Sequence, residues 1–333
     1  MEEIIKTYFF KNGIKFVENF ALLTKAILKT GTCNSSELSA SLCPDTKQNQ
    51  KANEMRIQRF LQNKNFQIDD ALWRKYTSFV FDLTRERGLI NKGDNILIKI
   101  DYTSETDNFL ILMASLEFGE KTIPIFFTMR KFPKKKGVFD KIKMEEAFIK
   151  GLRHILSKKY TYTIVADRGF GTLRFIELCE KNNFDYVVRI CDNLIVKKDE
   201  KTLNLQSFNG KNDTFSAQVI KWKKNLKFEI KTSENSTWFL ATNLENTEVS
   251  AIYEKRFGIE KLFQDQKTSG FNIERTKIRK YDRFKRLYFT VCFAQVIVVV
   301  LGDYIVSKNH PVKKNFSAYT GVISAFSRLD YVP

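Results

Sequence analysis

The spacing of apolar residues divides the chain into a helical first part and a second part in which strands alternate with helices. Up to about residue 90, apolar residues recur at helical intervals, for example at Phe16, Phe20 and Leu23. A second apolar stripe at helical spacing includes Ile57 and Phe60. These patterns predict an N-terminal helical domain over residues 1–90.

From residue 95 onward, short apolar runs predict strands. The expected strands are 96–100, 109–118, 122–129, 162–166 and 186–190, with helices at 140–157 and 172–182. The resulting order, β-β-β-α-β-α-β, predicts an α/β fold whose sheet mixes antiparallel and parallel pairs. Residues 91–191 are therefore expected to form the first part of a mixed-sheet core.

The last third of the chain changes pattern twice. Residues 192–244 contain short alternating segments and predict an all-β insertion. Residues 245–333 should complete the core with a polar-faced helix and closing apolar helices. The longest apolar stretch, Leu287 to Leu301, has 15 residues and contains Gln295. It is too short to cross a bilayer comfortably, so we expect a buried helix and no membrane association.

The charge balance points to a polyanionic partner. Lys and Arg number 56 against 38 Asp and Glu, which gives a formal charge of +18 and favours nucleic acid. Charges throughout the first residues argue against a signal peptide and for an intracellular protein. The five cysteines form no CxxC pair and the chain has two histidines, which argues against a structural zinc site.

Four polar residues recur along one side of the helix predicted after the insertion. At about 100° per residue, Tyr253, Arg256, Glu260 and Lys267 project within roughly 60° of one another. An ordinary solvated face would also carry charged residues. A tyrosine, a guanidinium, a carboxylate and an ammonium gathered on one face nevertheless suit a polar ligand.

Two aspartates follow predicted strands, where sheet proteins commonly place ligand sites. Asp101 follows 96–100, and Asp167 follows 162–166. Each could also be a simple turn or cap residue. With Glu260, however, they would supply three hard oxygen donors, which suit Mg²⁺ better than zinc or copper. Two such ions can activate a nucleophile and stabilise the leaving oxygen of a phosphodiester.

These residues carry a specific resemblance. Tyr253, Arg256, Glu260 and Lys267 reproduce without a gap the spacing Tyr-x2-Arg-x3-Glu-x6-Lys. That signature defines a cut-and-paste group of bacterial insertion-sequence DDE transposases. Residues 100–103 (Ile-Asp-Tyr-Thr) resemble the segment around the family's first aspartate, and 165–171 (Val-Ala-Asp-Arg-Gly-Phe-Gly) resemble its second. The resemblance covers roughly residues 20 to 300.

The resemblance implies a ribonuclease-H-like core with the β-rich insertion as a regular part of the group. It implies Asp101, Asp167 and Glu260 as catalytic ligands of two Mg²⁺ ions, for which Mn²⁺ can substitute. Such an enzyme cleaves and joins double-stranded DNA through a hairpin intermediate. Its partners would be the terminal inverted repeats, target DNA and a second copy of the chain in a homodimer. Its location would be the bacterial cytoplasm, at the nucleoid.

Trp238 resembles a family tryptophan that supports a base flipped out of the duplex. Stacking on such a base is worth roughly 1 to 3 kcal/mol. A core tryptophan in a strand remains an equal alternative. Some relatives have a second tryptophan directly after the motif arginine, where this chain has Phe257, which weakens the inference.

The remaining DNA-binding candidates are basic. Tyr253, Arg256 and Lys267 would bind phosphates beside the cleavage point. The segment 275–286 is the densest candidate for the DNA backbone, with Arg275, Lys277, Arg279, Lys280, Arg283, Lys285 and Arg286. A second candidate is the loop run Lys134, Lys135 and Lys136, although a solvated lysine run is an ordinary feature.

Two other functions fit parts of the pattern. A structure-specific nuclease on the same core would keep the carboxylates without needing Trp238. A DNA-binding remnant would keep the basic module without cleaving, although the intact Asp101, Asp167 and Glu260 argue against decay.

Overall fold

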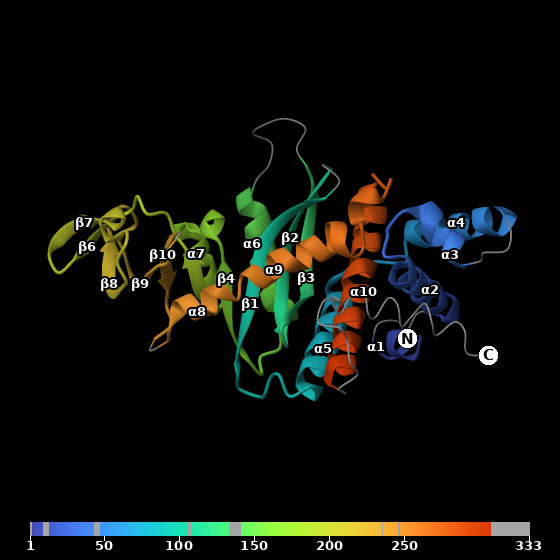
Figure 1. Ribbon diagram of the computed structural model, residues 1–333, viewed down its shortest axis with the longest axis horizontal. Helices are drawn as coiled ribbons and strands as arrows, with labels where there is room; N and C mark the ends of the chain where they lie inside the picture. Colours follow the sequence, from blue (N-terminus) through green and yellow to red (C-terminus); the bar gives the residue numbers. More distant parts are fainter. Residues whose placement is uncertain are drawn as a thin grey trace.

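The computed structural model describes residues 2–8, 13–42, 47–105, 108–132, 141–234, 236–245 and 247–307. Within these ranges the chain forms a long mixed sheet with helices packed around it (Figure 1). The predicted mixed α/β class is confirmed. The lysines proposed as a DNA-binding run, Lys134 to Lys136, lie outside the described residues, as do residues 308–333.

The first part of the chain is helical, as predicted. Its helices are α1 (Glu2–Tyr8), α2 (Ile14–Thr30), α3 (Ser35–Leu42), α4 (Lys47–Gln62) and α5 (Asp70–Glu86). Phe20 of α2 packs on Phe289 and Phe293 of the last helix, α10 (Tyr281–Ser307), with ring centroids 6.2 and 5.3 Å away. Helix α10 therefore joins this helical module to the rest of the core.

The core strands follow the predicted order. Strands β1 (Asn95–Glu105), β2 (Phe109–Phe118) and β3 (Lys121–Lys131) form an antiparallel meander. Strands β4 (Thr161–Ala166) and β5 (Asp185–Arg189) extend it in parallel beside β1. Helices α6 (Lys141–Ile155) and α7 (Leu173–Lys181) lie between these strands in sequence. The fully buried strand residues, such as Ile98, Ile100 and Ile164, make the centre of the core.

The insertion is β-rich, but it is not a separate sheet. Its strands are β6 (Ile195–Lys198), β7 (Lys201–Asn204), β8 (Asp213–Val219), β9 (Lys224–Thr232) and β10 (Thr237–Thr242). Strand β10 pairs antiparallel with β5, where Leu240 lies opposite Arg189. Among the described residues the strands thus form one ten-stranded sheet, in the order β3-β2-β1-β4-β5-β10-β9-β8-β6-β7.

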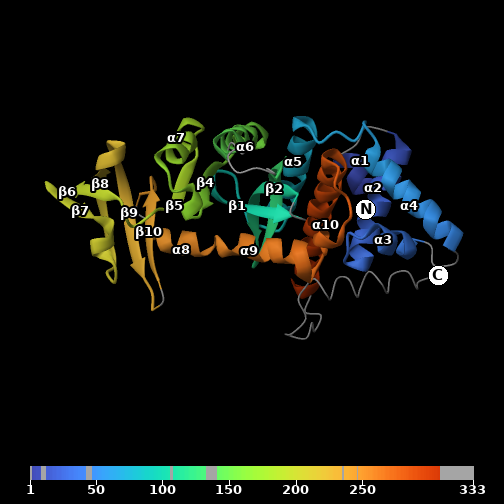
Figure 2. The same cartoon turned by 90° about the horizontal axis from the view of Figure 1, so that it is seen from above.

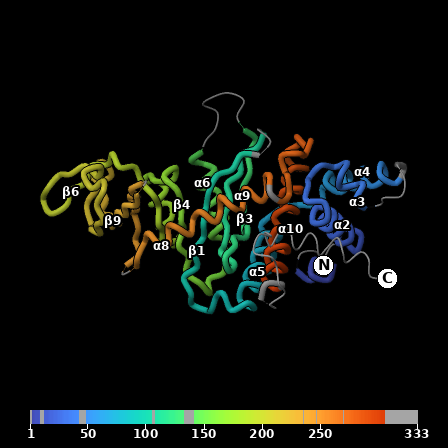
Figure 3. Tube along the Cα trace, in the orientation of Figure 1, coloured from blue at the N-terminus to red at the C-terminus, as the bar shows by residue number. Residues whose placement is uncertain are grey.

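The helices lie in two layers. In Figure 2, α6 and α7 lie on one side of the central strands, and the segment from α8 (Val249–Glu254) to α9 (Phe257–Gln264) runs along the other. The chain path in Figure 3 shows that this segment leads from the insertion back across the sheet towards α10. The helical module and the outer insertion strands lie at opposite ends of the molecule.

The predicted single helix over 253–267 is interrupted. Helix α8 ends at Glu254. Around Arg256 the backbone hydrogen bonds join residues three positions apart, as in a 3-10 turn, for example from Arg256 N to Tyr253 O at 2.9 Å. A π-helical turn (Asp265–Ser269) follows α9. The backbone stays near helical dihedrals at Lys255 and Arg256, so the direction of the chain is preserved while the regular 100° spacing is not.

Gly258 lets α9 approach the sheet closely. A Cβ at this position would lie 2.3 Å from Oγ1 of Thr122 and 3.0 Å from Nζ of Lys99. Lys99 is fully buried in β1 and donates to Thr122 at 3.0 Å. Because no larger side chain fits here without displacing buried polar groups, Gly258 fixes the distance between α9 and β1.

Gln295, which interrupts the apolar run, has buried partners. Its Oε1 accepts from Nε2 of Gln266 in the π-helical turn at 2.8 Å, and Tyr288 donates to Gln266 at 2.6 Å. A stretch of α10 from Tyr281 to Tyr304 is long and apolar enough to span a membrane, but 67% of that window is buried inside the protein. The expectation of a buried core helix is met.

The insertion also holds the start of α8. Glu248 at the N-cap position makes no side-chain cap. Instead, the buried carboxylate of Glu229 in β9 accepts from the backbone N of Val249 at 2.7 Å and of Ser250 at 2.8 Å. A carboxylate at a helix N-terminus satisfies free N–H groups and opposes the positive end of the helix dipole.

Replacing Glu229 with alanine should therefore lower the free energy of unfolding by about 2 kcal/mol, because two buried N–H donors lose their acceptor. Denaturant unfolding would measure the change, with the exposed Glu234→Ala as the control. Glu229→Gln keeps one acceptor oxygen and should lose less. Equal stability of the Glu229 and Glu234 alanine variants would contradict the capping role.

Candidate active site

The two predicted aspartates lie side by side on neighbouring parallel strands. Ile100 of β1 is in register with Ala166 of β4, so Asp101 and Asp167, the next residues, start from adjacent positions. Asp167 follows β4 and caps a short 3-10 turn by accepting from Gly169 N at 2.8 Å. Asp101 lies within β1 instead of after it, because β1 continues to Glu105 by pairing with β2.

Helix α9 brings Glu260 to the same place through Arg256. The Arg256 guanidinium donates from NH1 to Oδ2 of Asp101 at 3.3 Å and from NH2 to Oε1 of Glu260 at 2.6 Å. The Arg256 side chain is 7% exposed, whereas that of Glu260 is 53% exposed. The structure therefore brings Asp101 of the strand pair and Glu260 of the helix motif to one arginine.

The surroundings of Asp101 disfavour its charge. Burial, together with the negative charges of Asp167 and Glu260, raises the pKa of Asp101 to about 6. Hydrogen bonding from the Tyr102 N–H and the charge of Arg256 act in the opposite direction. A carboxyl whose pKa is raised by two neighbouring carboxylates is an arrangement that a cation would relieve.

The carboxylates have the donor chemistry of a divalent-metal site, but they are not arranged as a finished one. Among the described residues, no three His, Cys, Asp or Glu side chains lie close enough together to hold a metal ion. The Arg256 guanidinium separates Asp101 from Glu260 and takes an oxygen of each. Hard carboxylate oxygens at this position fit Mg²⁺ or Mn²⁺, provided that Arg256 releases them.

Tyr253 is buried, which the helical projection did not predict. Its side chain is 1% exposed and packs with Val165, Val187 and Leu240. Burial raises the pKa of Tyr253, while the charge of Arg256 and a hydrogen bond with it partly offset this effect. Arg256 thus contacts Tyr253 on one side and Glu260 on the other, as expected for residues on one side of a helix. Of the three side chains only Glu260 is exposed.

Trp238 lies beside this group. Its half-buried ring packs edge-on against Tyr253 at 5.2 Å between centroids and lies 6.0 Å from the ring of Phe257. Phe257 is 43% exposed, and the Arg256 guanidinium lies over its ring at 4.8 Å. Trp238 therefore combines ring contacts inside the protein with a partly exposed face.

Lys267 lies apart from these contacts, in the π-helical turn. The turn is anchored by Gln266, which is fully buried, and leaves Lys267 partly exposed. A π-turn directly after the glutamate helix changes the direction of Lys267 from that of a regular helix. Such turns occur frequently at functional sites.

Much of the basic segment 275–286 forms a seam with the helical module. Arg275 pairs with Glu37 of α3, and Arg286 donates to the carbonyls of Leu61 and Phe66 at 2.9 and 2.6 Å. Lys285 donates to a backbone carbonyl before α5. Arg283 lies against the Gln62 amide. Lys277, Arg279 and Lys280 are exposed and make no contact with the helical module among the described contacts, although Arg279 donates to the carbonyl of Thr276 at 3.2 Å.

The sequence analysis missed a polar cluster next to Asp101. The Tyr102 ring stacks on Phe170 with centroids 5.3 Å apart, and its hydroxyl donates to Oε1 of Glu145 at 3.3 Å. Glu145 is buried in α6 and also pairs with Arg174 of α7. The sequence contained a signal for this cluster: Glu145 stands at an inward position of the amphipathic helix α6, and a buried carboxylate requires a polar partner.

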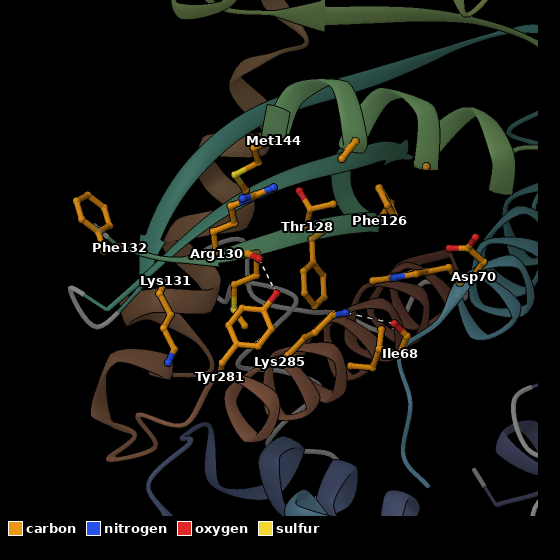
Figure 4. Close-up of a pocket in the computed structure, with 15 residues that line it drawn as sticks. Ile68, Asp70, Phe126, Thr128, Arg130, Lys131, Phe132, Met144, Tyr281 and Lys285 are labelled. Atoms are coloured by element: carbon orange, nitrogen blue, oxygen red, sulfur yellow. Dashed lines mark hydrogen bonds between the residues drawn. The ribbon is translucent and has the colours of Figure 1, made fainter. Parts of the chain in front are cut away.

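A pocket of about 830 Å³ lies away from the carboxylates, between α5, α6, the end of β3 and the start of α10 (Figure 4). Tyr281 donates to the carbonyl of Met129 at 2.6 Å beside it. Arg130 and Lys131 lie on its rim among apolar side chains such as Phe132. None of the three carboxylates lines this pocket, so its size does not identify the reaction site.

Comparison with known proteins indicates a class of protein for this chain. One solved structure, an endonuclease V from Bacillus subtilis, aligns over 74% of this chain and 98% of its own, at 10% identity and a TM-score of 0.28. A search of curated proteins found no match. Residues 140–297 match the family model described as a transposase DDE domain, a range that contains Asp167 and Glu260 but not Asp101. This match supports a transposase of the DDE type that acts on DNA, and the family it represents generally uses a divalent metal.

Proposed function

We propose that the chain cleaves the ends of an insertion sequence and joins them to target DNA, with Asp101, Asp167 and Glu260 as the catalytic carboxylates. The observation that carries this proposal is the register of β1 and β4, which sets the two aspartates side by side facing the helix of Glu260. The alternation of strands and helices around them suits a ribonuclease-H-like core.

Each carboxylate has a distinct place in this scheme. Asp101 and Asp167 each use Oδ1 to accept a backbone N–H, at 2.7 and 2.8 Å, which orients Oδ2. Glu260 is exposed on α9, where its Oε1 pairs with the Arg256 guanidinium at 2.6 Å. Two bound Mg²⁺ or Mn²⁺ ions would supply a polarised nucleophile and neutralise charge on the phosphodiester. The protein contributes positioning and charge balance.

Arg256 and Lys267 are proposed to bind phosphates beside the cleaved bond. Arg256 can present two parallel donors to a phosphate, and Lys267 supplies a mobile point charge. Tyr253 is too buried to reach DNA as placed, so we assign it to supporting the Arg256 guanidinium, which lies 5.5 Å from its ring centre. This assignment moves Tyr253 from direct DNA contact to positioning.

The duplex outside the cleavage site is proposed to follow the exposed bases Lys277, Arg279 and Lys280. Arg275 and Arg283 could join them only by leaving Glu37 and Gln62. Synapsis of two element ends would require a homodimer. Action on DNA in a bacterial cell implies a cytoplasmic, nucleoid-associated protein.

The proposal is tested with the protein and its own element ends. Inverted repeats in the DNA flanking the gene would supply the substrate, and a shuffled duplex of the same composition would be the control. With Mg²⁺ and target DNA we expect end-specific nicks, hairpin ends and joined products. Nicks without joining would favour the nuclease alternative, and binding without nicks would favour a silent remnant.

Replacing Trp238 with alanine should reduce hairpin yield about tenfold while leaving the first nick nearly unchanged, because stacking on a flipped base is worth roughly 1 to 3 kcal/mol. Phe257→Ala should act in the same direction, since its ring lies 6.0 Å from that of Trp238. Denaturing gels would separate nicked from hairpin products.

The matched control is Trp222→Ala, which removes another half-buried tryptophan of the insertion. Loss of nicking and of soluble protein in Trp238→Ala, with no such loss in Trp222→Ala, would identify Trp238 as a core residue. Unchanged hairpin yield in a well-folded Trp238 variant would exclude the base-stacking role.

A further inference from the structure

Arg256 occupies the oxygens that a divalent metal would need. Asp101 Oδ1 accepts from the Tyr102 N–H at 2.7 Å, so Oδ2 is the oxygen left for a cation. The Arg256 guanidinium takes that Oδ2 at 3.3 Å and Oε1 of Glu260 at 2.6 Å. One buried side chain thus bridges two of the three carboxylates.

Charge balance explains why the bridge is stable. Asp101 is largely buried beside two other carboxylates, and the Arg256 side chain, 7% exposed, supplies the opposing charge. The nearest buried ammonium on the same strand, Lys99, is instead engaged by Thr122 and Glu117, at 3.0 and 3.8 Å. A guanidinium and a dication at the same oxygens would repel each other, so the site holds one or the other.

The same arginine has unused capacity for an anion. Its Nε is buried and has no hydrogen-bond partner among the described residues. A phosphate that accepts from Nε and one terminal nitrogen would satisfy this donor and turn the guanidinium away from at least one carboxylate. The geometry therefore links three events at one side chain: release of Asp101, release of Glu260 and binding of phosphate.

We propose that Arg256 is an internal competitor of the catalytic metal, and that a DNA phosphate relieves this competition. The inference rests on the proposed function, since it takes the carboxylates as metal ligands. Without DNA, Arg256 lowers metal affinity and restrains unspecific hydrolysis. With DNA, the guanidinium moves to phosphate and the carboxylates become available. By linkage, DNA and metal then strengthen each other's binding by the same factor.

The test is calorimetric titration of the full chain with Mn²⁺ alone, without DNA, so that no cleavage enters the readout. Arg256→Gln removes the charge and leaves a shorter polar side chain. Its Mn²⁺ affinity should exceed that of wild type by about 5- to 150-fold, the usual range for coupled sites. Arg256→Lys keeps the charge but replaces the planar guanidinium with a shorter side chain that ends in a point charge, and it should give an intermediate value.

Lys261→Gln is the matched control, because it removes one positive charge from the exposed side of the same helix. It should stay within about twofold of wild type, since an exposed charge is largely screened by solvent. Equal affinities of wild type, Arg256→Gln and Lys261→Gln would overturn the competition while leaving the metal site intact.

Other outcomes remain distinguishable. Weaker binding by both Arg256 variants would mean that Arg256 organises the carboxylates instead of blocking them, which also overturns the inference. No Mn²⁺ binding by any protein would remove the metal site itself, and with it the proposed function. If Arg256→Gln does not fold, the same comparison is made between Arg256→Lys and Lys261→Gln.

Discussion

Replacing Glu260 with glutamine is expected to abolish end cleavage, with a loss on the order of 10³-fold or more, as for other groups that balance charge at a reacting centre. Glutamine keeps the size and the hydrogen bond to Arg256 but lacks the negative charge that a divalent ion requires. Product formation on labelled element ends would measure the rate, and thermal unfolding would confirm that the variant is folded.

The fold should tolerate this change, because the Glu260 side chain is 53% exposed and lies outside the hydrophobic core. Glu254→Gln is the matched control: it removes an exposed carboxylate from the preceding helix, α8, and touches neither aspartate. Its cleavage rate should stay within about twofold of wild type. Equal cleavage by both variants would exclude Glu260 from catalysis.

The aspartate pair could be predicted from sequence because its cause is local. A run of apolar residues ending in an aspartate defines a strand and places a carboxylate at its end, and this held for Asp167. For Asp101 the predicted position was less accurate, because this residue lies inside β1 and not at its end. The extra length of β1 comes from pairing with β2, and the register of two strands is not encoded in either one alone.

The helix motif shows what an ideal projection leaves out. The projection at 100° per residue placed Tyr253, Arg256 and Glu260 on one side of the helix, and the contacts of Arg256 with the other two agree with it. It did not predict that Tyr253 is buried, because burial depends on β10 of the insertion lying beside β5. It also assumed regular geometry up to Lys267, whereas the chain forms a π-helical turn that the buried Gln266 network holds.

The basic segment illustrates a different limit. Seven bases within twelve positions predicted a DNA-binding strip, and composition is a sound guide to net charge. Several of these bases are nevertheless committed to partners remote in sequence, such as Glu37 for Arg275 and the carbonyl of Phe66 for Arg286. Because such pairing is a tertiary property, charge density overstates the bases that can reach DNA.

Replacing Asp101 with asparagine is expected to abolish cleavage and, without metal, to stabilise the fold at neutral pH. Surrounding burial and like charges raise the pKa of Asp101 from 3.8 to about 6. Below pH 4 the carboxyl is protonated in both the folded and the unfolded chain, and it does not lower the free energy of unfolding. Between the two pKa values, 3.8 and about 6, the unfolded chain releases the proton that the folded chain retains, so the free energy of unfolding falls as pH rises.

Above about pH 6 the full cost applies, and it amounts to about 3 kcal/mol for this difference in pKa. The asparagine side chain cannot ionise, so the Asp101→Asn variant should gain on wild type between pH 4 and 6 and keep a constant lead at higher pH. Denaturant unfolding of both proteins from pH 3.5 to 8 in chelator would measure the difference.

Asp185→Asn is the control for the pH series, because Asp185 begins β5 and hydrogen-bonds the Asn243 side chain, away from the carboxylates. The change of stability with pH in Asp101→Asn is compared with that in this variant. A pH-independent difference for Asp101→Asn would mean that Arg256 already balances the charge of Asp101. If the relative stability rises with pH only in Asp101→Asn, the folded protein holds the ionised Asp101 at a cost in stability. Added Mn²⁺ should then stabilise the wild type alone and reduce the difference in unfolding free energy between the two proteins.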